Sequence, residues 1–136
     1  MPRKTNATIP ADWLLVAEAD LAMIRDSLGN DVAFTPCRAK LAEALEKLIK
    51  AELIRCGWAL VKTHDLQFLA TELAVRDATL EEEIRPLCQS LSEFYLGTRY
   101  PGFDLEDPDW PTLRAQLAAV TALKEKIRAR VAPTAP

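Results

Sequence analysis

The sequence predicts an all-α protein, folded as an up-and-down bundle of four to five helices. Leucine, alanine, glutamate and lysine dominate the long segments, and these residues favour helix. Glycine occurs only four times, and no Asn-Gly or Asp-Gly hairpin signal is present. No segment alternates apolar and polar residues with a period of two, so we expect essentially no sheet. Helices of this length with short connections pack as antiparallel neighbours.

The first two helices are delimited by proline and glycine. The first is expected to start near Pro10, whose fixed φ suits a first turn, and to stop at Gly29-Asn30. The second should begin around Thr35-Pro36 and end at Gly57. Their apolar positions recur every three or four residues, at Trp13, Ala17, Leu21, Ile24 and Leu28, and at Cys37, Leu41, Leu45, Leu48 and Ala51.

The opposite face of the second helix is polar. It carries Glu43, Glu46, Lys47 and Lys50, which form two i,i+4 pairs with the acid on the N-terminal side. This order is the favourable one on a helix surface. We therefore expect a solvated face with ion pairs from Glu43 to Lys47 and from Glu46 to Lys50.

The second half of the chain contains the remaining helices. Residues 58–63 are expected to form an apolar loop lying on the bundle, and Thr63 or Asp65 to cap a third helix. The spacing of Thr79 and Glu82 predicts a capping box that opens a fourth helix, which continues towards residue 98. Pro86 either kinks that helix or divides it in two.

The last helix should start near Pro111, after a turn-rich connection over residues 100–111, and run to Val131. A chain of 136 residues fits one domain, here 1–136, with an ordered core of about 10–131. We expect the tails, residues 1–8 and 132–136, to fray.

Composition restricts the partners and the compartment. The net charge of −3 gives no general attraction to phosphate, so a nucleic-acid role requires a local basic patch, and no DNA partner is expected. No apolar run approaches the roughly 18 residues of a membrane span, and the N-terminus lacks an apolar signal segment. We expect a cytoplasmic protein without a membrane partner. The three widely spaced cysteines predict neither a disulfide framework nor a zinc site.

Catalytic signatures are missing from the sequence. The single histidine, His64, excludes metal sites that need two, and no nucleophile elbow or glycine-rich phosphate loop is present. The run 81–83 is acidic, but consecutive helical residues point in different directions and do not converge on an ion. We therefore expect no catalytic residue, no metal and no cofactor.

Three ordered stretches combine basic, aromatic and histidine residues. They are EKLIKA at residues 46–51, KTHDL at 62–66 and YLGTRYP at 95–101. Their order and separation resemble the HEPN family, named for higher eukaryotes and prokaryotes nucleotide-binding. The pattern of that family is an EKxxKA helix, a KTHDL-like turn and a late RYP element. Trp13 and Asp20-Leu21 in the first helix also fit, and the resemblance extends from about Trp13 to Val131.

The resemblance implies a helical bundle, usually a homodimer, tied to a nucleotide or RNA ligand. Bacterial members often accompany a separate minimal nucleotidyltransferase, in pairs that look like toxin–antitoxin modules. In HEPN ribonucleases four to six residues separate an arginine from the histidine that follows it, so that the arginine would stand here at one of residues 57–59. None of those residues is basic, and Arg55 lies too far from His64 for that motif. RNA cleavage is therefore not carried over.

Seven residues are candidates for ligand binding: Lys47, Lys50, Lys62, His64, Asp65, Arg99 and Tyr100. The lysines and the arginine offer cationic donors to a phosphate, and the tyrosine a face for a base. The structural alternatives are a solvated lysine face, a histidine that donates to a backbone carbonyl, an aspartate that caps a helix, and an arginine that pairs with Glu46.

The leading hypothesis is a non-catalytic, nucleotide- or substrate-binding HEPN protein that acts beside a nucleotidyltransferase. One alternative is a divergent HEPN ribonuclease toxin, in which folding brings Arg55 or Arg99 to His64. Another is a pure protein-interaction module. For a dimer contact, the sequence suggests the apolar loop around Trp58 and Leu60 and the rim Trp110-Pro111.

Overall fold

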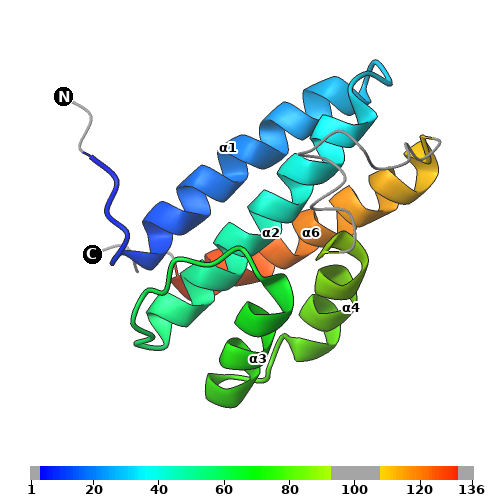
Figure 1. The fold of residues 1–136 in the computed structure, drawn as a ribbon. Coiled ribbons are helices and arrows are strands. Elements are labelled where there is room, and N and C mark those ends of the chain that lie inside the picture. The colour runs from blue at the N-terminus through cyan, green and yellow to red at the C-terminus, as the bar shows by residue number, and fades with distance from the viewer. Residues whose placement is uncertain (1–3, 93–107, 132–136) are drawn as a thin grey trace.

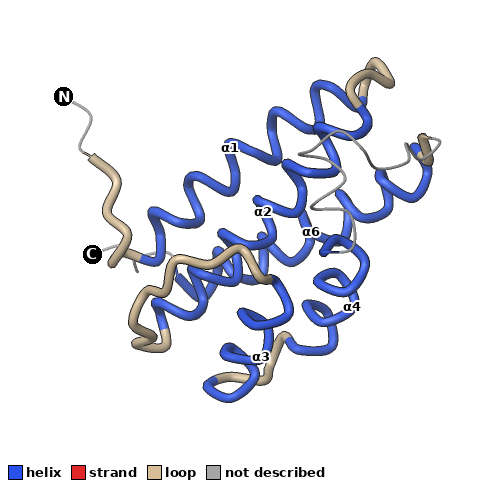
Figure 2. Tube along the Cα trace, in the orientation of Figure 1, coloured by secondary structure: helices blue, strands red, loops and turns tan. Residues whose placement is uncertain are grey.

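The computed structural model describes residues 4–92 and 108–131, which form five helices and no strand (Figures 1 and 2). The helices are α1 (Pro10–Leu28), α2 (Phe34–Arg55), α3 (Leu66–Arg76), α4 (Glu81–Ser92) and α6 (Trp110–Val131). The predicted all-α bundle is confirmed. No described helix is long and apolar enough to cross a bilayer.

Helix α2 is the centre of the bundle, because it contacts each of the other four described helices. The long helices α1 and α2 lie side by side, α6 packs against both, and α3 and α4 form a shorter pair beside them (Figure 1). Apolar side chains of α2 are therefore buried on several sides. The fully buried ones include Leu41, Leu45, Leu48, Ile49 and Leu53.

Backbone geometry sets the ends of α2. Ala33 has a left-handed conformation, with φ of 59°, and α2 begins at the next residue, Phe34, slightly before the expected Thr35-Pro36 start. At the other end, Gly57 has φ of +84°, a conformation that side chains rarely adopt. The chain reverses there, since the amide of Trp58 donates to the carbonyl of Leu53 at 2.9 Å. The prediction that Gly57 ends this helix is confirmed.

The α3–α4 pair corrects one local prediction and resolves another. The backbone amide of Thr79, which a capping box directs to Glu82, donates to the carboxylate of Asp77 at 3.0 Å, and α4 begins only at Glu81, so the predicted capping box with Glu82 is wrong. The carboxylate of Asp77, two residues away, accepts that hydrogen bond in place of Glu82. Pro86 lies inside one continuous helix, Glu81–Ser92, and does not divide it there. The predicted continuation towards residue 98 lies outside the described residues.

The connection between α2 and α3 contains both a buried aromatic residue and exposed apolar residues. Trp58 is only 6% exposed and belongs to the hydrophobic core, whereas Leu60 and Val61 are exposed. Trp110 is half-buried, with its ring edge-on to Phe34 at a centroid distance of 5.3 Å. Trp58 therefore stabilises this chain internally, whereas Leu60 and Val61 remain on the surface.

Candidate functional site

The polar face of α2 meets the turn before α3 in a compact group that we call the His64 cluster: Glu46, Lys50, Thr63 and His64. One carboxylate oxygen of Glu46 accepts from the Lys50 ammonium at 2.8 Å, and the other lies 2.8 Å from Nδ1 of His64. Lys50 also donates to the backbone carbonyl of Thr63 at 2.9 Å. Two of the three motif stretches therefore converge in space.

Burial of this cluster corrects the expectation of a solvated helix face. Glu46 is 7% exposed and Lys50 is 5% exposed. The start of α1 lies against this face, and the Lys50 ammonium is 5.4 Å from the centre of the Trp13 ring. The turn at Thr63 supplies a further partner from the other side. A buried lysine requires such partners, and Lys50 has a carboxylate, a carbonyl and an aromatic ring.

His64 lies at the surface edge of the cluster. Its side chain is 63% exposed, while the side chain of Glu46 beneath it is 9% exposed. An ionised carboxylate only accepts hydrogen bonds, so Nδ1 of His64 is the donor to Glu46. The structural alternative of a bond to a backbone carbonyl is wrong for Nδ1, which bonds a carboxylate instead. This contact fixes the orientation of an exposed imidazole.

Two other candidate residues, Lys47 and Asp65, make their contacts outside the His64 cluster. Lys47 donates to Asp20 of α1 at 2.6 Å, and not to the expected Glu43, which pairs with Lys40 at 2.7 Å. Asp65 caps α3 by accepting from the amide of Phe68 at 3.1 Å, as its structural alternative predicts.

The three remaining candidates, Lys62, Arg99 and Tyr100, determine the extent of the site. Lys62 is exposed on the turn that leads to His64. Arg99 and Tyr100 lie outside the described residues, so the third motif stretch has no place in the described geometry. The site as described therefore consists of the His64 cluster and the exposed Lys62 beside it.

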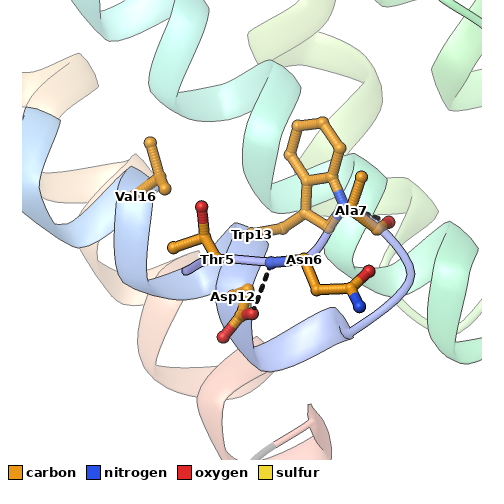
Figure 3. A pocket seen from close by; sticks show the side chains of 6 residues that line it. All are labelled: Thr5, Asn6, Ala7, Asp12, Trp13 and Val16. Carbon is orange, nitrogen blue, oxygen red and sulfur yellow. Dashed lines mark hydrogen bonds between the residues drawn. The ribbon is translucent and has the colours of Figure 1, made fainter. Parts of the chain in front are cut away.

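The structure contains a pocket beside the cluster that the sequence does not predict. Its described lining consists of Thr5, Asn6, Ala7, Asp12, Trp13 and Val16, and its volume is about 140 Å³ (Figure 3). The segment before α1 crosses over Trp13, whose indole Nε1 donates to the carbonyl of Ala7 at 2.9 Å. The amide of Asn6 donates to Asp12 at 2.8 Å. No spacing signal announces such a pocket, because it depends on how the N-terminal segment folds back.

A second buried ion cluster occupies the C-terminal end of α2. Glu52, 1% exposed, accepts from Nε of Arg55 at 2.8 Å and lies 3.0 Å from Nε of Arg130 on α6. Asp77, at the end of α3, accepts from Arg55 at 2.7 Å and also pairs with Arg130. This network joins α2, α3 and α6.

The network also determines where Arg55 lies relative to the histidine. Arg55 follows Glu46 by nine residues, which is two and a half helical turns, or about 13.5 Å along the axis on the opposite side of α2. Its guanidinium is held there by Glu52 and Asp77. Among the described contacts, Arg55 serves the second ion cluster and not the His64 cluster.

Acid is expected to weaken this second cluster through Asp77. Hydrogen bonds from Thr79, and then from Arg55, hold the pKa of Asp77 well below its usual range. A lowered pKa in the folded state contributes stability that is present above the unfolded pKa of about 4 and is lost as the pH falls below it. The free energy of unfolding should therefore drop below about pH 4 by more in the wild type than in Asp77→Asn. Equal pH profiles in urea titrations of the two proteins would contradict this assignment.

The chemistry available at the His64 cluster is hydrogen bonding and charge. Among the described residues, no group of three or more metal-ligating side chains is close enough to hold an ion. An exposed imidazole and an exposed ammonium, supported by a buried ion pair, suit the oxygen atoms of an anionic ligand. The described part of the chain is thus a helical-bundle protein with a histidine- and lysine-bearing surface patch.

Comparison with known proteins identifies the family to which this bundle belongs. The model of the HEPN domain matches residues 10–126, which covers most of the chain. The protein is therefore a member of the HEPN domain family. No curated protein and no solved structure matches the chain.

Proposed function

We propose that this HEPN protein is a non-catalytic component that binds a nucleotide or RNA at the surface around His64 and Lys62. The observation that carries the proposal is the exposed imidazole of His64, oriented by the buried carboxylate of Glu46. A ligand-binding imidazole needs such a fixed orientation, because a freely rotating ring loses conformational entropy when it binds.

The charges around the cluster favour an anionic ligand at its rim. The charge of Glu46 is balanced within the protein by the Lys50 ammonium at 2.8 Å. The exposed ammonium of Lys62 and the imidazole of His64 then lie outside a neutral, buried pair. Phosphate oxygens are suitable acceptors for both groups. Lys47 contributes less to binding of the anionic ligand, since its ammonium already pairs with Asp20.

The position of Arg55 supports a binding role over the ribonuclease alternative. A cleavage mechanism of the family type needs an arginine beside the histidine, and Arg55 is held by Glu52 and Asp77 on the opposite side of α2. With four to six residues between the arginine and His64, the arginine would stand at Gly57, Trp58 or Ala59, none of which is basic. These two observations favour binding without catalysis.

The proposed location, oligomeric state and partner of the protein follow from the family resemblance. We propose a cytoplasmic homodimer that works beside a minimal nucleotidyltransferase, in a pair of the toxin–antitoxin type. The exposed side chains of Leu60 and Val61, 39% and 45% exposed, offer apolar surface for a dimer or partner contact close to the histidine turn. Trp58 does not offer such surface, because its side chain is in the core.

Calorimetric titration with ATP, GTP and a short single-stranded RNA tests the proposal. Lys62→Ala and His64→Ala should each weaken the Kd about tenfold, the loss of one charged hydrogen bond. Lys126→Ala provides the control, because this half-exposed lysine on α6 pairs with Glu83 of α4 and should leave the Kd unchanged. No binding at millimolar ligand, or equal losses in all three variants, would contradict the proposed site.

An RNA-cleavage assay decides between binding and catalysis. Wild-type protein and His64→Ala are incubated with the same labelled RNA, and both are expected to leave it intact. Cleavage by the wild type that vanishes in His64→Ala would replace this proposal by the ribonuclease alternative. A nucleotidyltransferase that co-purifies with a chain showing no nucleotide affinity would instead favour the pure interaction module.

A further inference from the structure

An exposed aromatic side chain, Phe68, lies four residues after His64 at the start of α3. It is 39% exposed. The other aromatic residues that the structure describes are buried or half-buried: Trp13, Phe34, Trp58 and Trp110. Phe68 is therefore the described aromatic ring that is most accessible to a ligand.

Helix geometry explains why Phe68 is not part of the core. The buried residues of α3 are Leu66, Leu69, Ala70 and Leu73. Each residue of an α-helix is rotated by about 100° from the one before, so Phe68 lies about 200° around the axis from Leu66, away from the bundle. Val75 shares this outer side and is 78% exposed. The hydrophobic core of the described residues includes the four buried side chains of α3 and not Phe68.

The ring of Phe68 adjoins the turn that carries Lys62 and His64. The amide of Phe68 donates at 3.1 Å to the carboxylate of Asp65, the residue that directly follows His64. Helical side chains lean towards the N-terminus of their helix, so the Phe68 ring covers the first turn of α3, on the side of the histidine turn. An exposed ammonium, an exposed imidazole and an exposed aromatic ring therefore occur within residues 62–68.

The charges of this segment distinguish the two ends of a nucleotide. Lys62 and His64 suit a phosphate group. Asp65, which is exposed and caps α3, repels a phosphate from the start of the helix. The part of a nucleotide that suits the α3 side is therefore its uncharged base. An aromatic ring offers a base a face for stacking, whatever the identity of that base.

We infer that Phe68 stacks on an unpaired base of an RNA whose phosphate binds at Lys62 and His64. This inference rests on the proposed function and specifies the structural class of its ligand. The faces of bases inside a duplex are covered by neighbouring base pairs, whereas bases of a single strand are open to an aromatic side chain. Phe68 thus contributes affinity for single-stranded RNA and none for a duplex.

Fluorescence anisotropy with an end-labelled RNA, as a single strand and as a duplex with its complement, tests this contribution. Phe68→Ala should weaken the Kd for the single strand about tenfold, the worth of one base stack, and leave the Kd for the duplex unchanged. Phe68→Leu, which keeps apolar surface without a ring, should lose nearly as much, and Phe68→Trp should retain the affinity. Val75→Ala, on the same outer side of α3, is the matched control and should change neither Kd. Equal losses for single strand and duplex in Phe68→Ala would overturn the inference.

The Phe68→Trp variant also reports the contact directly. The chain has three tryptophans, so the ¹⁵N-labelled variant gains a fourth indole N–H signal. Binding of the single strand should shift this added signal. The signal of Trp58 is the internal control, because that side chain is 6% exposed and belongs to the core. An added signal that stays unmoved while the RNA binds would overturn the stack.

Ribose phosphate, which has no base, separates failure of this inference from failure of the proposed function. It should bind the wild type and Phe68→Ala equally, and bind Lys62→Ala and His64→Ala more weakly. RNA affinity that falls in Lys62→Ala and His64→Ala but not in Phe68→Ala would overturn the stack and leave the proposed function intact. The reverse pattern would support the stack and contradict the phosphate role of the two residues. Absence of any RNA binding by the wild type would overturn both.

Light scattering excludes the other use of an exposed ring, a contact between protein chains. The wild type and Phe68→Ala should have the same molecular mass in solution. A smaller mass for Phe68→Ala would assign the ring to a contact between copies of the chain and overturn its role in stacking. Thermal unfolding of each variant confirms that losses of affinity come from folded protein.

Discussion

Replacing Leu45 with alanine is expected to lower the free energy of unfolding by about 3–4 kcal/mol. Leu45 is 0% exposed and lies on α2, the helix that contacts each of the other described helices. Truncating its side chain removes buried apolar surface and leaves a cavity between α2 and the helices packed against it. Urea titration followed by circular dichroism measures the loss.

Leu15→Ala is the matched control for this experiment. Leu15 is a leucine on a neighbouring helix, but its side chain is 59% exposed. Its replacement should change the free energy of unfolding by no more than about 0.5 kcal/mol. If the two variants lose equal stability, α2 is not the centre of the core.

Replacing Glu52 with alanine is expected to cost about 2–3 kcal/mol of stability. Glu52 is 1% exposed and holds the guanidinium groups of Arg55 and Arg130. Removing one member of a buried ion cluster leaves the remaining charges without compensation, typically at a cost of about 3–5 kcal/mol. We expect less here, because side chains that are 29% and 23% exposed retain some contact with water.

The control for Glu52 is an exposed pair of the same chemistry. Glu72 and Arg76 pair at 2.8 Å on α3, with side chains that are 30% and 33% exposed. Surface pairs of this kind contribute about 0.3–0.5 kcal/mol, so Glu72→Ala should be nearly neutral in the same titration. A Glu52→Ala variant as stable as Glu72→Ala would show that the second ion cluster does not hold α6 against α2.

Most of the fold was predictable because its determinants are local. Pro10 and Gly57 mark helix ends through their own backbone preferences, and the apolar stripe from Leu41 to Leu48 shows the helical period directly. The capping box at Thr79 was not predictable from spacing. Asp77 accepts from the amide of Thr79 in place of Glu82, and Asp77 itself pairs with Arg55 of α2 and Arg130 of α6.

The candidate site was predictable only in part. The motif spacing indicated that Lys50 and His64 belong together, and the i,i+4 rule predicted the Glu46–Lys50 pair. Burial of that pair was not predictable, because it results from a turn more than ten residues away and from Trp13 on another helix. The Asp12 pocket likewise depends on tertiary packing of the N-terminal segment.

The imidazole resonance of His64 offers the most direct test of the binding surface. Since the chain contains one histidine, its Cε1 proton gives a single assigned signal in a proton spectrum. Adding a nucleotide or a short RNA should change the chemical shift of that signal until the binding site is saturated. At equal ligand concentration the change should be smaller in Lys62→Ala. A ligand that binds by calorimetry while the His64 signal stays unmoved would show that recognition occurs elsewhere on the bundle.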